Sequence, residues 1–215
     1  MRRVVITGVG LLTAAGTSVE EFWGNCLAGN SGIDHITLFD AAKYTSQIAG
    51  EVKQFDPEKE LDPKLVSRTG RFCQFALVTA GKALEDAGFG GLQPLPEELQ
   101  RRTAVIVGSG IGGMDVFEEQ HRRLLERGPQ RVSPFFVPMM IADMAAGMVA
   151  IETQAMGPNY CLVTACASSA HNIGAACREI QLGRADMAIT GGTEAVIVPT
   201  AVGGFCSAKA LSRRN

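Results

Sequence analysis

Runs of apolar residues alternate with amphipathic stretches along this chain, and most of the runs end at glycine. Continuous Val- and Ile-rich runs are typical of strands that are buried on both faces of a sheet. We predict such strands over residues 3–9 and 103–107, and in the stretches NYCLVTAC (159–166) and ADMAITGGTEA (185–195).

Helical periodicity fills the intervals between these strands. Ser18 and Glu21 form a capping box that opens a helix ending near Gly29. Further helices are predicted over residues 64–87, 114–127, 138–156 and 167–182, whereas residues 30–62 and 90–100 are expected to be irregular. Strands that alternate with helices predict an α/β fold with a mostly parallel sheet covered on both faces.

Composition narrows the class of protein. The chain has 215 residues, of which 46% are hydrophobic and 20% charged, and its net charge is −2. This balance is typical of a soluble globular protein and offers no basic field for nucleic acid. No stretch approaches the length of apolar sequence that a membrane span requires, so we expect neither nucleic acid nor membrane as a partner.

The N-terminal stretch MRRVVITGVGLLTAAG has two interpretations. Its arginines, apolar run and small residues are similar to those of a short signal peptide. Thr7, Gly8 and Gly10 interrupt the apolar run, which favours a first strand entering a glycine turn. The six scattered cysteines also favour reduced thiols inside a cell, and we expect a cytoplasmic protein.

A glycine motif follows the second predicted strand. Gly108, Gly110 and Gly113 match the G-x-G-x-x-G pattern of a dinucleotide-binding turn. Such a site also needs an acidic residue about 20 positions on, at the end of the next strand. The stretch RGPQRVSPFF has neither an acid nor a strand there. We therefore expect a tight turn at which the backbone closely approaches another group, and no nucleotide cofactor.

Cys166 is the strongest candidate for chemistry. A predicted strand runs into it, and a helix rich in small residues begins directly after it. A helix N-terminus favours a thiolate, and the small neighbours leave room for a substrate, so the segment resembles a nucleophile elbow with cysteine in place of serine. The alternative, a buried structural thiol, better suits four of the five other cysteines, namely Cys26, Cys73, Cys161 and Cys177.

No histidine is an obvious base for this cysteine. His171 is five positions along the same predicted helix, about 140° around its axis at about 100° per residue, and cannot be assumed to reach the sulfur. His121 lies in a charged helical run and His35 in an irregular segment. The sequence thus offers a nucleophile without an evident general base.

The segment TACASSAHNIGAACREIQLGRADMAITGGTEA resembles the active-site segment of the β-ketoacyl-acyl-carrier-protein synthases, the condensing enzymes of fatty-acid synthesis. RRVVITGVGLLTAAG, SGIGG, SPFFVP and GGFCSAKALSRRN are similar to the same family in the same order. The pattern is most similar to that of the type II, elongating members. The resemblance covers essentially all of residues 1–215, as one N-terminal half of a thiolase-like fold.

The resemblance implies layered α/β/α architecture, a homodimer and a two-stage reaction. Cys166 would take an acyl chain from the phosphopantetheine of acyl carrier protein, with its backbone N–H as part of the oxyanion hole. Malonyl-carrier protein would then lose CO2, and its carbanion would attack the thioester. No cofactor is implied. The implied acyl-pocket residues are Ile111, Phe205, Phe136 and Val137, the last two reaching the partner subunit's pocket, and the implied carrier-protein contacts are Arg68, Arg131 and Lys209.

The chain differs from the family because motifs of the family's C-terminal half are missing. The family's C-terminal half supplies two histidines, a lysine and a second oxyanion-hole amide, and none of those motifs is present here. The last strand of the N-terminal half's own sheet is also missing. We therefore expect a piece of a longer enzyme, with an exposed sheet edge and an apolar face. Such a chain should not complete the condensation without the C-terminal half.

Other functions remain open at this point. An initiating synthase, a polyketide ketosynthase or a thiolase that uses coenzyme A would share the small residues around Cys166. A non-catalytic partner subunit that sets chain length would typically lack the cysteine. A nicotinamide oxidoreductase would need the acidic residue that the glycine motif lacks.

Overall fold

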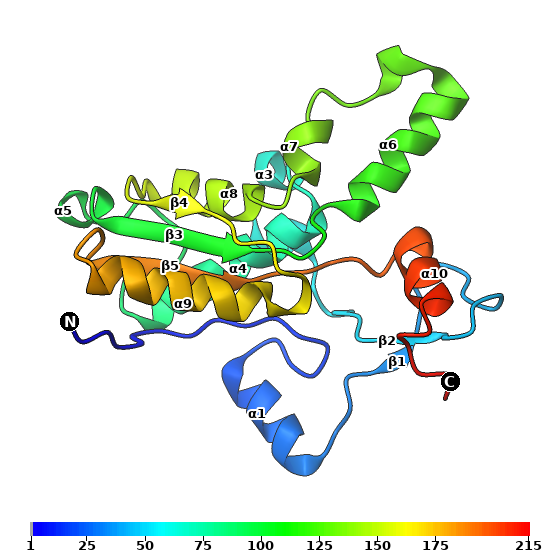
Figure 1. Cartoon of the computed structure of the whole chain (residues 1–215), viewed down its shortest axis with the longest axis horizontal. Coiled ribbons are helices and arrows are strands. Elements are labelled where there is room, and N and C mark those ends of the chain that lie inside the picture. Colours follow the sequence, from blue (N-terminus) through cyan, green and yellow to red (C-terminus); the bar gives the residue numbers. More distant parts are fainter. Residues whose placement is uncertain (1) are drawn as a thin grey trace.

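The computed structural model describes residues 2–215, and its centre is a three-stranded parallel sheet in the order β4-β3-β5 (Figure 1). The central strand β3 (Thr103–Gly108) pairs with β4 (Asn159–Tyr160) on one side and with β5 (Met187–Gly192) on the other. The expected parallel sheet is confirmed.

Helices cover both faces of this sheet. Helix α9 (Ser168–Gln181) packs on one face, and α4 (Arg71–Asp86) and α8 (Met144–Thr153) pack on the other. Val105 and Val107 of β3 join the core with α4 and α8, whereas Ala104 and Ile106 point to the α9 side. Because both faces are covered, every residue of β3 is buried, which explains its apolar run from Ala104 to Val107.

The remaining elements surround this three-layer centre. They are α1 (Val19–Ala28), β1 (Asp34–His35), β2 (Ile48–Ala49), α2 (Pro57–Glu60), α3 (Pro63–Val66), α5 (Glu97–Gln100), α6 (Met114–Arg127), η1 (Pro129–Arg131), α7 (Phe136–Met140), η2 (Ala165–Ala167) and α10 (Pro199–Ser207). In Figure 1, α6 and η1 project from one end of the sheet, and α10 lies beside the base of α6. No helix of residues 2–215 has the length and apolarity that a membrane crossing would need.

The predicted strand over residues 3–9 is wrong. This segment has no strand partner among the described residues, and Ile6 is 84% exposed. It lies against α4 instead. A Cβ on Gly8 would come within 2.1 Å of the Ala83 carbonyl oxygen, and one on Gly10 equally close to that of Thr79. The glycines therefore let the chain contact the backbone of a helix.

Two predicted helices are broken where they meet other backbone segments. The pattern over 64–87 forms α3 and α4, with a break that includes Gly70. Gly70 has an extended backbone, and a Cβ added to it would lie 2.7 Å from the Met139 carbonyl oxygen. The pattern over 138–156 forms α7 and α8, and the Met140 carbonyl accepts a hydrogen bond from the Gly113 N–H. Residues 30–62, expected to be irregular, contain the antiparallel pair β1–β2 and the short helix α2.

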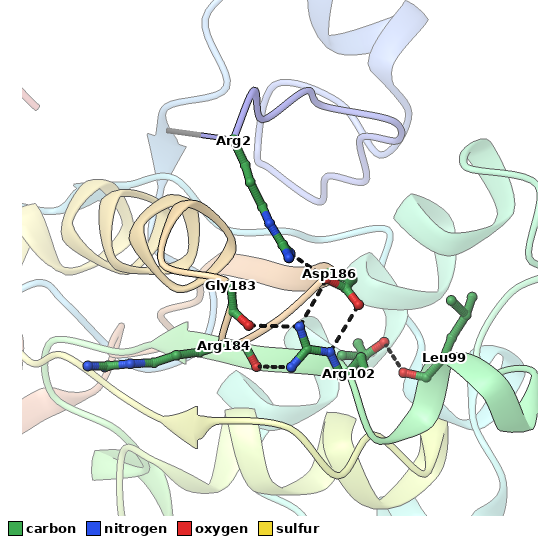
Figure 2. Close-up of polar contacts among 7 residues, drawn as sticks. Arg2, Leu99, Arg102, Gly183, Arg184 and Asp186 are labelled. Carbon is green, nitrogen blue, oxygen red and sulfur yellow. Dashed lines mark hydrogen bonds and ion pairs between the residues drawn. The ribbon is translucent and has the colours of Figure 1, made fainter.

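An arginine fork joins the starts of the two long strands (Figure 2). Arg102, just before β3, donates to both carboxylate oxygens of Asp186, just before β5, at 3.0 and 3.1 Å. Its guanidinium also donates to the carbonyls of Gly183 and Arg184. Arg2 adds an ion pair of 2.6 Å to the same carboxylate. The N-terminal segment is thus tied to the end of the sheet opposite the glycine turn.

Candidate active site

Cys166 lies between the sheet and a helix that has no side-chain cap. It is exposed in η2, two residues before α9 begins. The N-cap residue of α9 is Ala167, whose side chain offers no acceptor. The Ser168 N–H bonds to the Ala165 carbonyl, and the first turn of α9 has no side-chain cap, so the positive end of the helix dipole lies close to the Cys166 thiol in the chain. This arrangement confirms the predicted helix start after the cysteine.

The peptide before Cys166 has an unusual backbone. Ala165 has a φ of +52°, in the left-handed region that costs an alanine about 1–2 kcal/mol. Its carbonyl oxygen accepts a hydrogen bond of 2.7 Å from the Ser168 hydroxyl. Because the peptide is trans, the Cys166 N–H points away from that contact, and it has no acceptor among residues 2–215. It is free to donate to a developing oxyanion.

Side chains of α9 hold the remainder of this turn. The Ser168 hydroxyl also accepts from the Thr164 N–H at 2.9 Å. Asn172, fully buried, donates to the carbonyls of Leu162 and Ser168 and accepts from the Leu162 N–H. His171 Nδ1 lies 2.7 Å from the Thr164 hydroxyl oxygen. Within residues 2–215, no hydrogen bond joins Cys166 to a histidine.

These contacts correct the predicted third strand. NYCLVTAC forms a strand only at Asn159 and Tyr160, because the backbone of Leu162 is bonded by the Asn172 amide instead of by β3. Beyond Tyr160 the chain leaves the sheet and turns toward Cys166.

The glycine motif forms the surface on which this turn lies. A Cβ on Gly108 would come within 2.1 Å of the Asn172 side-chain nitrogen, and one on Gly110 within 3.2 Å of the Ala165 carbonyl oxygen. A Cβ on Gly113 would meet the Met139 carbonyl oxygen at 2.3 Å. The close approaches that require these glycines are therefore to the chain's own backbone and side chains.

Glu194 fastens the glycine loop to the segment after β5. Its carboxylate accepts from the Ser109 hydroxyl at 2.8 Å and from the Gly110 N–H at 2.9 Å. Ser109 is buried and accepts in turn from the Gly112 N–H. Glu194, after β5, thus holds the loop that carries Gly110, and Ser168 of α9 holds the turn that carries Cys166.

The four predicted pocket residues come from three separate parts of the chain, namely the loop after β3, α7 and α10. Ile111 follows Gly110, whose added Cβ would lie 3.2 Å from the carbonyl oxygen of Ala165, the residue before Cys166. Phe136, at the start of α7, packs its ring against Phe117 of α6 at 6.3 Å between centroids. Val137 and Phe205 are both exposed.

A cavity of about 550 Å³ lies elsewhere, between β2, α4 and the residues after β5. Glu194 lines it, but Cys166 does not.

The three predicted carrier-protein contacts are all exposed but are not joined to one another. The Arg68 guanidinium lies over the Phe135 ring at 5.3 Å, and Arg131 is in η1, a few residues before that ring. Lys209 follows α10 and has a φ of +56°. Helix α10 is tied to α6 by a hydrogen bond from the Thr200 N–H to Glu118.

The other cysteines differ in burial more than expected. Cys73 is buried, and burial raises the pKa of its thiol to about 12. Burial also raises the pKa of Cys161, which is half-buried. Cys26, expected to be a buried structural thiol, is exposed on α1 because this helix buries none of its residues. Cys177 is half-buried.

Sequence reasoning missed three residues that organise the site. Ser168 and Asn172 are four positions apart, so they share one face of α9, and this spacing was the available signal. Glu194 carried no local signal, because its partners Ser109 and Gly110 are 84 or more positions away in the sequence.

Comparison with known proteins identifies the family of this chain. The family model described as "Beta-ketoacyl synthase, N-terminal domain" matches residues 1–215. A 3-oxoacyl-[acyl-carrier-protein] synthase 2 of Staphylococcus aureus is 48% identical over 214 residues, covering 100% of this chain and 51% of the relative. The namesake of Coxiella burnetii is 46% identical over 214 residues, again 51% of its length.

Solved structures agree on the thiolase-like ketosynthase fold. A beta-ketoacyl synthase from Burkholderia phymatum superposes with a TM-score of 0.87 at 28% identity, covering 100% of this chain and 52% of that one. The ishigamide ketosynthase/chain length factor gives a TM-score of 0.85 at 31% identity, with 98% and 52% covered. The chain spans about half the length of the curated relatives it matches. Because the family model matches residues 1–215, the chain belongs to the beta-ketoacyl synthase family, as its N-terminal domain.

Proposed function

We propose that this chain carries the nucleophile of a 3-oxoacyl-[acyl-carrier-protein] synthase of fatty-acid elongation. The observation that supports it most is Cys166, exposed at the uncapped N-terminus of α9 beside its own free N–H. The relatives of nearly half identity that bear this name add support.

In the proposed first stage, the Cys166 thiolate attacks the thioester carbonyl of an acyl chain on the phosphopantetheine of acyl carrier protein. The Cys166 N–H stabilises the oxyanion that forms. The pantetheine thiolate leaves and takes a proton, and the acyl group remains on Cys166.

In the proposed second stage, malonyl-carrier protein loses CO2 and its carbanion attacks the acyl-cysteine. The carbon–sulfur bond breaks, which returns the thiolate and releases the 3-oxoacyl product on its carrier. We propose that this stage needs the C-terminal half of the enzyme, since residues 2–215 bring no histidine into a hydrogen bond with Cys166. No cofactor takes part in either stage.

We propose that the acyl chain extends past Ile111, with Phe136, Val137 and Phe205 as further walls. Ile111 has the strongest support, since neighbouring Gly110 lies against the carbonyl before Cys166. Val137 and Phe205 are exposed apolar side chains that a second subunit or domain would cover.

The proposed carrier protein is acidic, and exposed cations would attract it. Arg68, Arg131 and Lys209 are exposed and have no ion-pair partner among residues 2–215. Electrostatic attraction of this kind raises association rates. We propose a cytoplasmic location for this reaction.

A homodimer is part of the proposal. The outer edge of β4 is unpaired within residues 2–215, and exposed apolar side chains flank it, namely Ile151, Met156 and Val163. Light scattering should give twice the chain mass of 22.7 kDa, and Met156→Lys should shift it toward one chain. A single-chain mass for the parent at every concentration would contradict the dimer.

Acylation of the purified chain tests the nucleophile directly. After incubation with an acyl-carrier thioester, intact mass and peptide mapping should place one acyl group on Cys166. Cys166→Ala should abolish this adduct, whereas Cys26→Ser should keep it, because Cys26 is an exposed thiol on the distant helix α1. Equal labelling of Cys26 and Cys166, or none, would overturn the proposal.

A polyketide ketosynthase is the second candidate, because one solved neighbour at 31% identity is a ketosynthase/chain length factor. Competition between donors with plain acyl and polyketone chains separates the two. Preference for plain acyl chains supports fatty-acid elongation.

A further inference from the structure

Asn172 occupies the position that a neighbouring strand would otherwise fill. Its side-chain oxygen accepts from the Leu162 N–H at 2.9 Å, and its nitrogen donates to the Leu162 carbonyl at 3.0 Å. One residue's N–H and C=O are thus both bonded by a single amide, as in a pair of residues across a sheet. A third bond, 2.6 Å to the Ser168 carbonyl, anchors this amide to the first turn of α9.

Ser168 makes the next connection along the same turn. Its hydroxyl accepts from the Thr164 N–H and donates to the Ala165 carbonyl, so it spans the left-handed Ala165 from both sides. A hydroxyl with one donor and two lone pairs can make both bonds at once. Without them, the Ala165 backbone could relax to a less strained conformation and rotate the peptide that carries the Cys166 N–H.

The sheet contributes the space that this arrangement needs. Asn172 is completely buried, and a Cβ at Gly108 would overlap its nitrogen at 2.1 Å and approach the Leu162 carbonyl oxygen at 2.9 Å. Gly108 of β3 and Asn172 of α9, which are far apart in the sequence, are therefore both needed for the conformation of this turn. Neither Asn172 nor Ser168 is hydrogen-bonded to Cys166 in the described residues, so both would act through the backbone.

We propose that Asn172 and Ser168 are positioning residues that hold the Cys166 thiol and N–H at the N-terminus of α9, which has no side-chain cap. This inference rests on the proposed role of Cys166 as the nucleophile. It makes the reactivity of Cys166 a property of the resting protein, built before any acyl donor binds.

Site-resolved alkylation of the full chain tests this proposal. The chain is treated with iodoacetamide, and peptide mass spectrometry gives the labelling rate of Cys166 relative to the exposed Cys26. In Ser168→Ala and in the nearly isosteric Asn172→Leu, this ratio should fall by about threefold to tenfold as the thiol leaves the field of the helix N-terminus. Ser168→Thr keeps the hydroxyl and should restore most of the ratio.

The matched control is Ser169→Ala, the same substitution one residue on, since the Ser169 hydroxyl has no hydrogen bond within residues 2–215. Cys73 reports folding, because it is buried and should stay unlabelled in a folded variant. If Asn172→Leu exposes Cys73, the comparison of Ser168→Ala with Ser168→Thr tests the proposal by itself. A parent-like ratio in Ser168→Ala with Cys73 protected would overturn the proposal, whether or not the parent accepts an acyl group from a carrier thioester.

Discussion

Gly108 and Gly174 differ in what surrounds them, and this difference gives a test at the scale of one residue. Gly108 faces the Asn172 nitrogen and the Leu162 carbonyl, whereas Gly174 has open space around it within α9. Gly108→Ala should destabilise the protein by about 1–3 kcal/mol, because a buried side chain and backbone must shift. Gly174→Ala should stabilise it by about 0.5–1 kcal/mol, because alanine favours a helix.

Urea unfolding of both variants measures this difference. Equal midpoints for Gly108→Ala and the parent would mean that Asn172 and the Leu162 backbone adapt to the added methyl, and that Gly108 is not required for packing. A loss of stability in Gly174→Ala would show that the space beside α9 is filled in solution.

At the scale of elements, α4 is the helix that the core depends on most. Leu77 is completely buried between α4 and the core shared with α8 and the sheet, whereas Leu27 on α1 is 72% exposed. Leu77→Ala should reduce the free energy of unfolding by about 2–5 kcal/mol, and Leu27→Ala should change it by no more than about 0.5 kcal/mol. Chemical denaturation compares the two, and similar losses would contradict the assignment of the core.

Elements specified by local signals were predictable from the sequence. Helix α6 spans Met114–Arg127, as its amphipathic pattern predicted, and Ser18 caps α1 with a hydrogen bond from the Glu21 N–H. Buried strand β3 was predicted by its unbroken apolar run.

The wrong predictions fall where contacts with residues distant in the sequence determine the backbone conformation. Residues 3–9 have strand-like composition, but a strand also requires a pairing partner, and composition does not supply one. The Leu162 backbone bonds an amide ten positions away. At the site, Cys166 was predictable from its place before a helix, whereas the bonds of Ser168, Asn172 and Glu194 depend on tertiary geometry.

At the scale of the whole molecule, Asp186 connects the N-terminal segment with the starts of β3 and β5 (Figure 2). Hydrogen bonds from Arg102 and then Arg2 lower the pKa of this carboxyl to about 2, from an ordinary value of 3.8. A lowered folded-state pKa contributes stability that is fully present above the ordinary value and is lost as the pH falls toward the lowered one.

Asp186→Asn should therefore be less stable than the parent at neutral pH, and the difference should close as the pH falls from about 4 to about 2. Denaturant midpoints measured across this range give the comparison. Because the carboxyl is exposed, added salt should also narrow the difference at pH 7. A difference that persists unchanged at pH 2 would exclude the ion pairs as its cause.

The bonds from Asn172 and Ser168 have a consequence for how this fold can vary. They attach the turn that carries Cys166 to α9, so the sulfur, its N–H and the helix N-terminus form one mechanical unit. The proposed walls of the acyl channel come from elsewhere, from the loop after β3 and from α7 and α10. Substitutions in those walls can therefore change the length and shape of the proposed channel. They leave the position of Cys166 relative to α9 unchanged.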